Sequence, residues 1–86
     1  MIACELEIKN PTGLHAGPAS QLCKIAKNCN STITITCGDK LVNPRSIFSI
    51  LRGEMTKGKK IKIVAEGEDE QTVMKELTEF IEGLKE

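Results

Sequence analysis

The sequence predicts a two-layer α+β fold in the order βαββαβα, with strands in one layer and helices in the other. Four segments alternate apolar and polar residues, which is the pattern of a half-buried strand. Two longer segments repeat apolar residues every three or four positions, which is the pattern of a helix with one buried stripe. The 86 residues suffice for one small domain, 1–86, in which these apolar faces cover each other.

The first strand is expected over residues 2–8, where apolar side chains alternate with charged ones. Residues 10–13, Asn-Pro-Thr-Gly, have the composition of a turn. A helix then runs to about residue 28, with a buried stripe and an open face. The stripe consists of Ala19, Leu22, Cys23 and Ala26, and the open face carries Ser20, Gln21, Lys24 and Lys27.

A hairpin is expected next. Isoleucine and cysteine alternate with threonine over residues 32–37, residues 38–39 form a turn, and residues 40–43 return as a short strand. Ser46 is a favoured N-cap, so a short helix is expected over residues 47–52.

This short helix has too many apolar residues for one buried stripe. Either Ile50 alone anchors it, or part of the set Ile47, Phe48 and Leu51 is exposed. An exposed apolar cluster on a small domain usually marks a docking site. The alternative is that all of these residues belong to the core.

The last strand is expected over residues 61–65, and an acidic turn, 66–69, leads into the last helix. That helix buries one face and leaves a charged face in water. The buried face consists of Val73, Met74, Leu77, Ile81 and Leu84, and the charged face of Lys75, Glu76, Glu79 and Glu82.

The composition argues against several functions. Twelve basic and twelve acidic residues cancel, and only Phe48 and Phe80 are aromatic, so nothing indicates nucleic-acid binding. The sequence shows no secretory signal and no apolar run long enough for membrane insertion, so a cytoplasmic location is expected. No cofactor is indicated.

The four cysteines lack C-x-x-C spacing, and no metal site is expected. Cys4, Cys23 and Cys37 fall on apolar faces, where cysteine serves as a small buried hydrophobe. A thiol or metal protein is the alternative that the number of cysteines favours and their spacing does not.

The only histidine, His15, lies where the strand pattern gives way to the helical one. Pro18 fits the first turn of a helix, so His15 is expected at or just before a helix N-terminus. Unpaired backbone N–H groups gather at such a terminus and favour an anion. A neutral imidazole there is a nucleophile beside a phosphate site, and the alternative is a polar loop residue near a cap.

Two local sequences, together with the order of elements, resemble the HPr phosphocarrier family of bacterial sugar phosphotransferase systems. Residues 13–19, Gly-Leu-His-Ala-Gly-Pro-Ala, are similar to the family signature G-[apolar]-H-[small]-R-P-A. Residues 43–48, Asn-Pro-Arg-Ser-Ile-Phe, are similar to its regulatory serine region. Residues 65–70 resemble its last strand–helix junction, and the resemblance covers essentially the whole chain.

The resemblance implies an HPr-like open-faced sandwich with strand order 1-4-2-3, and a phosphoryl relay rather than a turnover enzyme. His15 would accept a phosphoryl group on Nδ1 from enzyme I, which phosphoenolpyruvate charges, and donate it to the A domains of sugar permeases. Backbone N–H groups of Ala16 and Gly17 would hold the phosphate oxygens.

The resemblance also implies a surface on which a monomeric carrier docks transiently with enzyme I and the permease domains. An apolar centre within a polar rim is the usual anatomy of such an interface. The centre would be Ile47, Phe48 and Leu51, and the rim Ser20, Lys24 and Lys27.

Gly17 departs from the family pattern, which has an arginine at this position. That arginine supplies charge-assisted hydrogen bonds to the phosphoryl group. Only amide donors remain unless Arg45, Arg52 or Lys57 reaches the site. Slow transfer or a specialised set of partners is therefore expected.

Ser46 matches the serine that HPr kinase/phosphorylase modifies in Gram-positive relatives, and a plain N-cap serine is the alternative. A phosphate at an N-cap meets the helix dipole favourably. We therefore consider a second function besides the first. It is a regulatory module that acts through phosphorylated Ser46 on a transcriptional regulator in catabolite repression, with the His15 relay weakened or lost.

Overall fold

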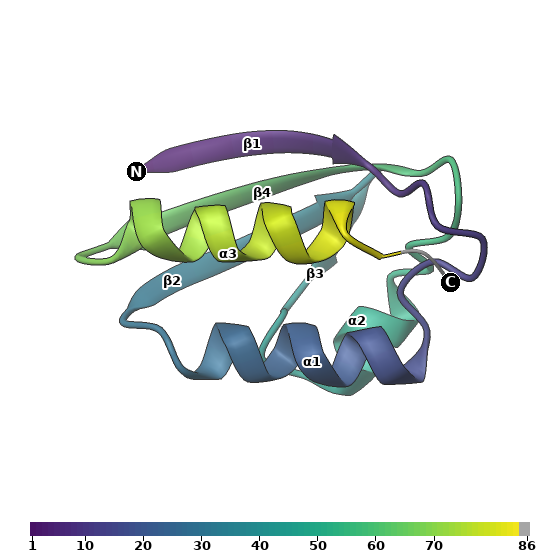
Figure 1. Cartoon of the computed structure of the whole chain (residues 1–86), viewed down its shortest axis with the longest axis horizontal. Coiled ribbons are helices and arrows are strands. Elements are labelled where there is room, and N and C mark those ends of the chain that lie inside the picture. The colour runs from purple at the N-terminus through teal and green to yellow at the C-terminus, as the bar shows by residue number, and fades with distance from the viewer. Residues whose placement is uncertain (85–86) are drawn as a thin grey trace.

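The computed structural model describes residues 1–84, so the last two residues of the expected domain, 1–86, lie outside it. The elements are β1 Ile2–Glu7, α1 Ala16–Lys27, β2 Ser31–Cys37, β3 Lys40–Val42, α2 Ile47–Arg52, β4 Lys60–Gly67 and α3 Glu70–Glu82. The strands form one antiparallel sheet in the order β1-β4-β2-β3, and α1 and α3 lie side by side against one face of it (Figure 1). The expected α+β sandwich and its strand order are confirmed.

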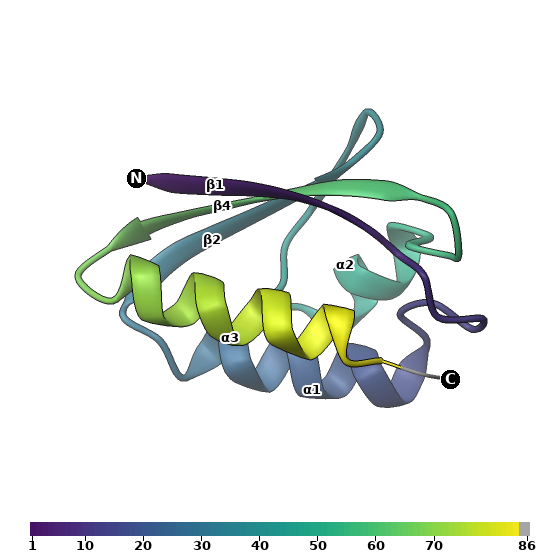
Figure 2. The same cartoon turned by 45° about the horizontal axis from the view of Figure 1, so that its top comes forward.

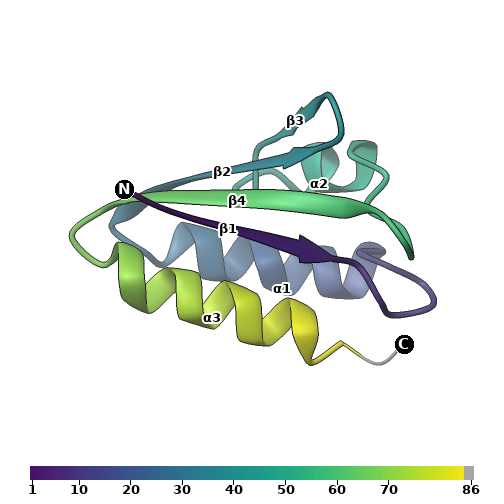
Figure 3. The same ribbon diagram turned by 90° about the horizontal axis from the view of Figure 1, so that it is seen from above.

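The core lies between the sheet and these two helices, as the view from above makes clear (Figure 3). Apolar residues of neighbouring strands lie opposite one another, so that Cys4, Ile63, Ile35 and Val42 form one row across all four strands. Residues at alternate positions therefore share the face that the helices cover. The helical stripes are buried as expected, with Ala19, Leu22, Cys23 and Ala26 in α1 and Val73, Met74, Leu77 and Ile81 in α3. No helix within residues 1–84 is long and apolar enough to cross a membrane.

The end of the chain differs from expectation in two places. β4 continues to Gly67, through the first half of the expected turn, because Glu66 and Gly67 pair with the first residues of β2. Gly67 permits this pairing, since a Cβ there would lie 2.6 Å from the Cα of Ser31 and its φ is +155°. α3 ends at Glu82, so Leu84 follows the helix, where it is half-buried against the core.

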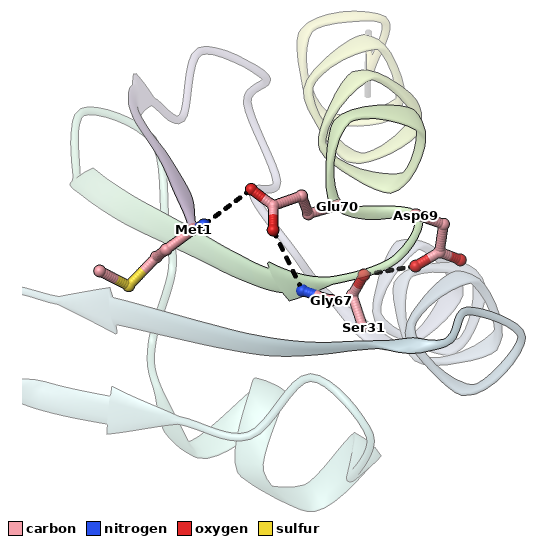
Figure 4. Close-up of polar contacts among 5 residues, drawn as sticks. All are labelled: Met1, Ser31, Gly67, Asp69 and Glu70. Atoms are coloured by element: carbon pink, nitrogen blue, oxygen red, sulfur yellow. Dashed lines mark hydrogen bonds and ion pairs between the residues drawn. The ribbon is translucent and has the colours of Figure 1, made fainter.

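Polar contacts join the start of α3 to the turn between α1 and β2 (Figure 4). Asp69 is the N-cap residue of α3, but its carboxylate does not cap that helix. It accepts hydrogen bonds from the Ser31 hydroxyl and from the Asn30 backbone N–H, the latter at 2.9 Å. These two hydrogen bonds, that of Ser31 foremost, lower the pKa of Asp69.

Glu70 makes a second set of contacts at the same end of the molecule (Figure 4). One carboxylate oxygen lies 2.9 Å from the α-amino group of Met1, and the other accepts from the Gly67 backbone N–H at 3.2 Å. The contact with the amino group, followed by that with Gly67, lowers the pKa of Glu70. The sheet edge and the start of α3 are thereby tied together.

We expect the Asp69→Asn variant to be less stable than the parent near neutral pH and to approach it in acid. Asp69 has a lower pKa folded than unfolded, so its contribution is complete above its ordinary pKa of 3.8. The contribution is lost as the pH falls through the lowered folded pKa. Urea unfolding followed by far-ultraviolet circular dichroism measures this, since the chain has no Trp or Tyr.

Asp39→Asn is the matched control, because it removes the same charge from the exposed turn between β2 and β3. Its unfolding free energy should stay close to that of the parent. An Asp69→Asn deficit that is constant across the acid range would contradict the assigned hydrogen bonds.

Candidate functional site

His15 stands at the end of a loop that packs against the segment between α2 and β4. Leu14 is buried, and its N–H donates to the carbonyl of Met55 at 2.9 Å. Gly13 adopts a φ of +62°, and a Cβ at this position would lie only 2.4 Å from that same carbonyl oxygen. The Asn10 side chain closes the loop by donating to the Gly13 carbonyl at 2.8 Å. These contacts fix the direction in which the chain enters α1.

His15 is the N-cap residue of α1, as expected. Its backbone is extended, and its carbonyl accepts from the Ala19 N–H at 2.8 Å, which is the first hydrogen bond of the helix. Its imidazole makes no capping hydrogen bond and is half-exposed. The ring lies over Gly17, since a Cβ there would be 3.6 Å from its Cε1 and 3.9 Å from its Nδ1. The Nδ1 edge is therefore next to the first turn of α1 and within reach of solvent.

The first turn of α1 offers two donors to an anion beside the ring. The N–H groups of Ala16 and Gly17 have no partner within the helix, and Pro18 has no N–H. No acidic residue stands in this turn, so nothing there offsets the positive end of the helix dipole. These two amides could donate hydrogen bonds to a phosphoryl group on Nδ1.

Arg45 is excluded as a replacement for the arginine that position 17 lacks. Its guanidinium donates to the carbonyls of Ala26 at 3.1 Å, Ser31 at 3.2 Å and Cys29 at 3.4 Å. These carbonyls lie at and just beyond the C-terminal end of α1, where a cation is favourable. A helix of 12 residues is about 18 Å long, so Arg45 is far from the imidazole.

The other two expected cations are not bonded to the His15 loop in the part of the chain that the structure describes. Arg52 belongs to the last turn of α2 and lines a groove beside β3. Lys57 is exposed in the loop that follows Met55. Within residues 1–84, neither side chain forms an ion pair or hydrogen bond with the His15 loop. The positive end of α1 is the group that the structure places directly against the imidazole.

Ser46 is the N-cap residue of α2. Its hydroxyl accepts from the Ser49 N–H at 3.3 Å, and its carbonyl accepts from the Ile50 N–H at 3.0 Å. The helix spans the expected residues 47–52. Ser46 is half-buried, so its hydroxyl lies at the edge of the surface that α2 presents.

The first and second helices lie side by side (Figures 1 and 2) and present the expected rim and apolar residues to solvent. Only Ile50 of α2 is fully buried. Exposure is 40% for Ile47, 81% for Phe48 and 41% for Leu51. Ser20, Lys24 and Lys27 are exposed on α1. Of the two alternatives for α2, the structure has the exposed apolar cluster.

The four cysteines are free thiols. Cys23 and Cys37 are buried and Cys4 is half-buried, all packed in the core as expected. The thiol of Cys29 donates to the carbonyls of Ala26 and Ser31 at the end of α1. No group of His, Cys, Asp and Glu within residues 1–84 has the arrangement of a metal site.

Two contacts that position α1 were missed from the sequence. Met55 is 2% exposed and anchors the His15 loop through its carbonyl, yet it is an isolated apolar residue in a polar stretch. Arg45 fixes the end of α1 from a position close to Ser46. Gly13 in the turn was the sequence signal for the contact with Met55, and no pattern indicates the contacts of Arg45.

Comparison with known proteins gives a consistent result. The family model described as the PTS HPr component phosphorylation site matches residues 2–83. The phosphocarrier protein HPr of Borreliella burgdorferi is 45% identical over 86 residues, which is all of both chains. A crystal structure of HPr from Thermoanaerobacter tengcongensis is 38% identical, with a TM-score of 0.91 over 96% of this chain and 93% of that one. An HPr dimer from the same organism is also 38% identical, with a TM-score of 0.75 over 96% and 95%.

We expect Gly13→Ala to destabilise the fold more than Gly38→Ala, although both glycines have nearly the same positive φ, +62° and +65°. A Cβ at Gly38 meets nothing within 4 Å, so that variant carries only the left-handed penalty of about 1–2 kcal/mol. At Gly13 the Cβ also overlaps the Met55 carbonyl, which adds roughly 1–3 kcal/mol. Urea unfolding of both variants measures the difference, and equal losses would rule out the close backbone contact.

Proposed function

The chain belongs to the HPr family of phosphocarrier proteins, and we propose that His15 is the residue on which it carries its phosphoryl group. The protein is a phosphocarrier of the phosphotransferase system, not a turnover enzyme. The observation that carries the proposal is the imidazole at the start of α1, half-exposed and with Nδ1 beside Gly17.

The transfer needs a lone pair on Nδ1, which the neutral imidazole with its proton on Nε2 supplies. As the bond from Nδ1 to phosphorus forms, the bond from phosphorus to the donor breaks. The amides of Ala16 and Gly17 would hold the phosphoryl oxygens. When the group is passed on, a bond from phosphorus to the acceptor forms and the bond from Nδ1 to phosphorus breaks. His15 is then unmodified again.

The partners of this relay are components of the phosphotransferase system. We propose enzyme I as the donor and permease A domains as the acceptors, which implies a cytoplasmic location. The proposed docking surface consists of Ile47, Phe48 and Leu51 with Ser20, Lys24 and Lys27. Its support is the exposure of an apolar centre beside polar residues on the adjacent helix.

Ser46 is proposed as a site of regulatory phosphorylation by an HPr kinase/phosphorylase. A phosphate at the N-cap of α2 would be favoured by the helix dipole and would add charge beside the apolar docking residues. The alternative function, a regulatory module that acts on a transcriptional regulator after the relay is lost, has Gly17 in its favour. The phosphocarrier relatives favour the relay, so we retain it as the leading proposal.

We expect phosphoenolpyruvate and enzyme I to place an acid-labile phosphate on this protein and none on His15→Ala. Phosphohistidine is lost in acid and phosphoserine survives, so the acid step distinguishes the relay from modification of Ser46. Mass spectrometry before and after acid treatment detects both kinds of phosphorylation. Absence of acid-labile phosphate on the parent would refute His15 as the carrier.

We expect Gly17→Arg to accept phosphate from enzyme I roughly ten- to a hundredfold faster in kcat/KM, because one charge-assisted hydrogen bond contributes about 1.5–3 kcal/mol. The Cβ of residue 17 has ordinary contact distance to the ring, so the side chain fits without moving His15.

Gly17→Ala is the matched control. It adds the same Cβ and favours the helix but supplies no charge. Its rate should stay at the parental value. If Gly17→Ala and Gly17→Arg behave alike, the missing cation does not limit transfer.

A further inference from the structure

A groove runs between β3 and α2, beside the proposed docking surface. Its volume is about 540 Å³, which admits a few side chains of a partner. The lining residues are Lys40 and Leu41 of β3, Ser46, Phe48, Ser49 and Arg52 of α2 and its cap, and Gly53. The groove takes no part in the chemistry at His15.

Two large apolar side chains flank this groove without being covered. Leu41 is 74% exposed and Phe48 is 81% exposed. Leu41 lies opposite Thr36 in the register, on the face of the sheet that the helices leave open. Phe48 belongs to the proposed docking surface, so the apolar surface continues from α2 across the groove to β3. Apolar patches of this kind mark interaction sites.

The charges at the groove are positive. Lys40 forms an ion pair with Glu54 at 3.1 Å, whereas Arg52 has no ion-pair partner within residues 1–84. Within residues 40–53, from which the lining of the groove comes, three residues are basic and none is acidic. This excess of positive charge at the groove favours an acidic partner.

We propose that this groove binds an acidic segment of a phosphotransferase partner that inserts a large apolar side chain between Leu41 and Phe48. A carboxylate of that segment pairs with Arg52. The inference rests on the proposed function for the identity of the partner, and it adds β3 to the docking surface. Leu41 and Arg52 then govern affinity and choice of partner, while His15 governs transfer.

The test measures the Kd of the unphosphorylated full chain for enzyme I and for a permease A domain of the same bacterium by titration calorimetry. Leu41→Thr should weaken binding to at least one of them roughly tenfold, as expected for a leucine that becomes buried. Val64→Thr is the matched control, because it also places threonine on the open face of the sheet, outside the groove. Its Kd should equal that of the parent.

Arg52→Gln should weaken the same complex at low salt, and the loss should fade as salt rises, because screening weakens the ion pair it removes. Lys62→Gln, on the open face of β4 and outside the groove, is the control for loss of one positive charge. Unfolding free energies of all four variants verify that they are folded.

Several outcomes would overturn the proposal. One is a parental Kd for Leu41→Thr with both partners, and another is no binding of either partner to the unmodified chain. A dimer in sedimentation that Leu41→Thr dissolves would assign the groove to a second copy instead. Because binding is measured without phosphate, these results are independent of whether His15 accepts phosphate.

Discussion

The contact between the backbone of the His15 loop and the backbone around Met55 is the constraint on which the site depends. Leu14 donates to the Met55 carbonyl, and Gly13 lies so close to it that no side chain fits. The contact joins two main-chain segments, one before α1 and one after α2. It therefore determines where α1 begins relative to α2, and with it the position of the imidazole at the start of α1.

The two helix starts on this surface treat their N-cap side chains differently. Ser46 uses its hydroxyl to accept from the Ser49 N–H, whereas the His15 ring makes no capping bond. A Ser, Thr, Asp or Asn at position 15 would stabilise α1 by about 1 kcal/mol through such a bond. The chain forgoes this stabilisation and keeps the ring free at the helix terminus. The proposed role of His15 therefore goes with a lower stability of α1, as is common at functional sites.

The sequence was sufficient to predict the strands and the buried stripes of the helices, because each of these elements has one face exposed to solvent. Alternation in residues 2–8 and 32–37 has no competing interpretation, and the spacing from Ala19 to Ala26 has only the helical one. The limits of β4 were less certain, since Gly67 resembles a turn residue. It continues the strand because it pairs with Ser31 of β2, and this close pairing leaves no room for a side chain at position 67.

The site was predictable in part. A lone histidine before a helix with proline in its first turn placed His15 at the N-cap, and serine before an apolar run did the same for Ser46. Exposure of Phe48 was not decidable, because a six-residue helix buries whichever residues its neighbours allow, and only tertiary contacts select Ile50. The use of Arg45 at the end of α1 likewise depends on segments that are remote in sequence.

The position of β4 has a consequence for how the protein is made. The last strand in the sequence is central in the sheet, between β1 and β2. Both neighbours therefore lack a hydrogen-bonding partner on one side until β4 has been synthesised. During synthesis β1, α1 and the β2–β3 hairpin leave the ribosome before β4. The sheet cannot assemble until residues 60–67 have followed. Such non-local pairing slows folding relative to a helical bundle of equal length. The nascent chain thus becomes a competent carrier only after residues 60–67 have been synthesised.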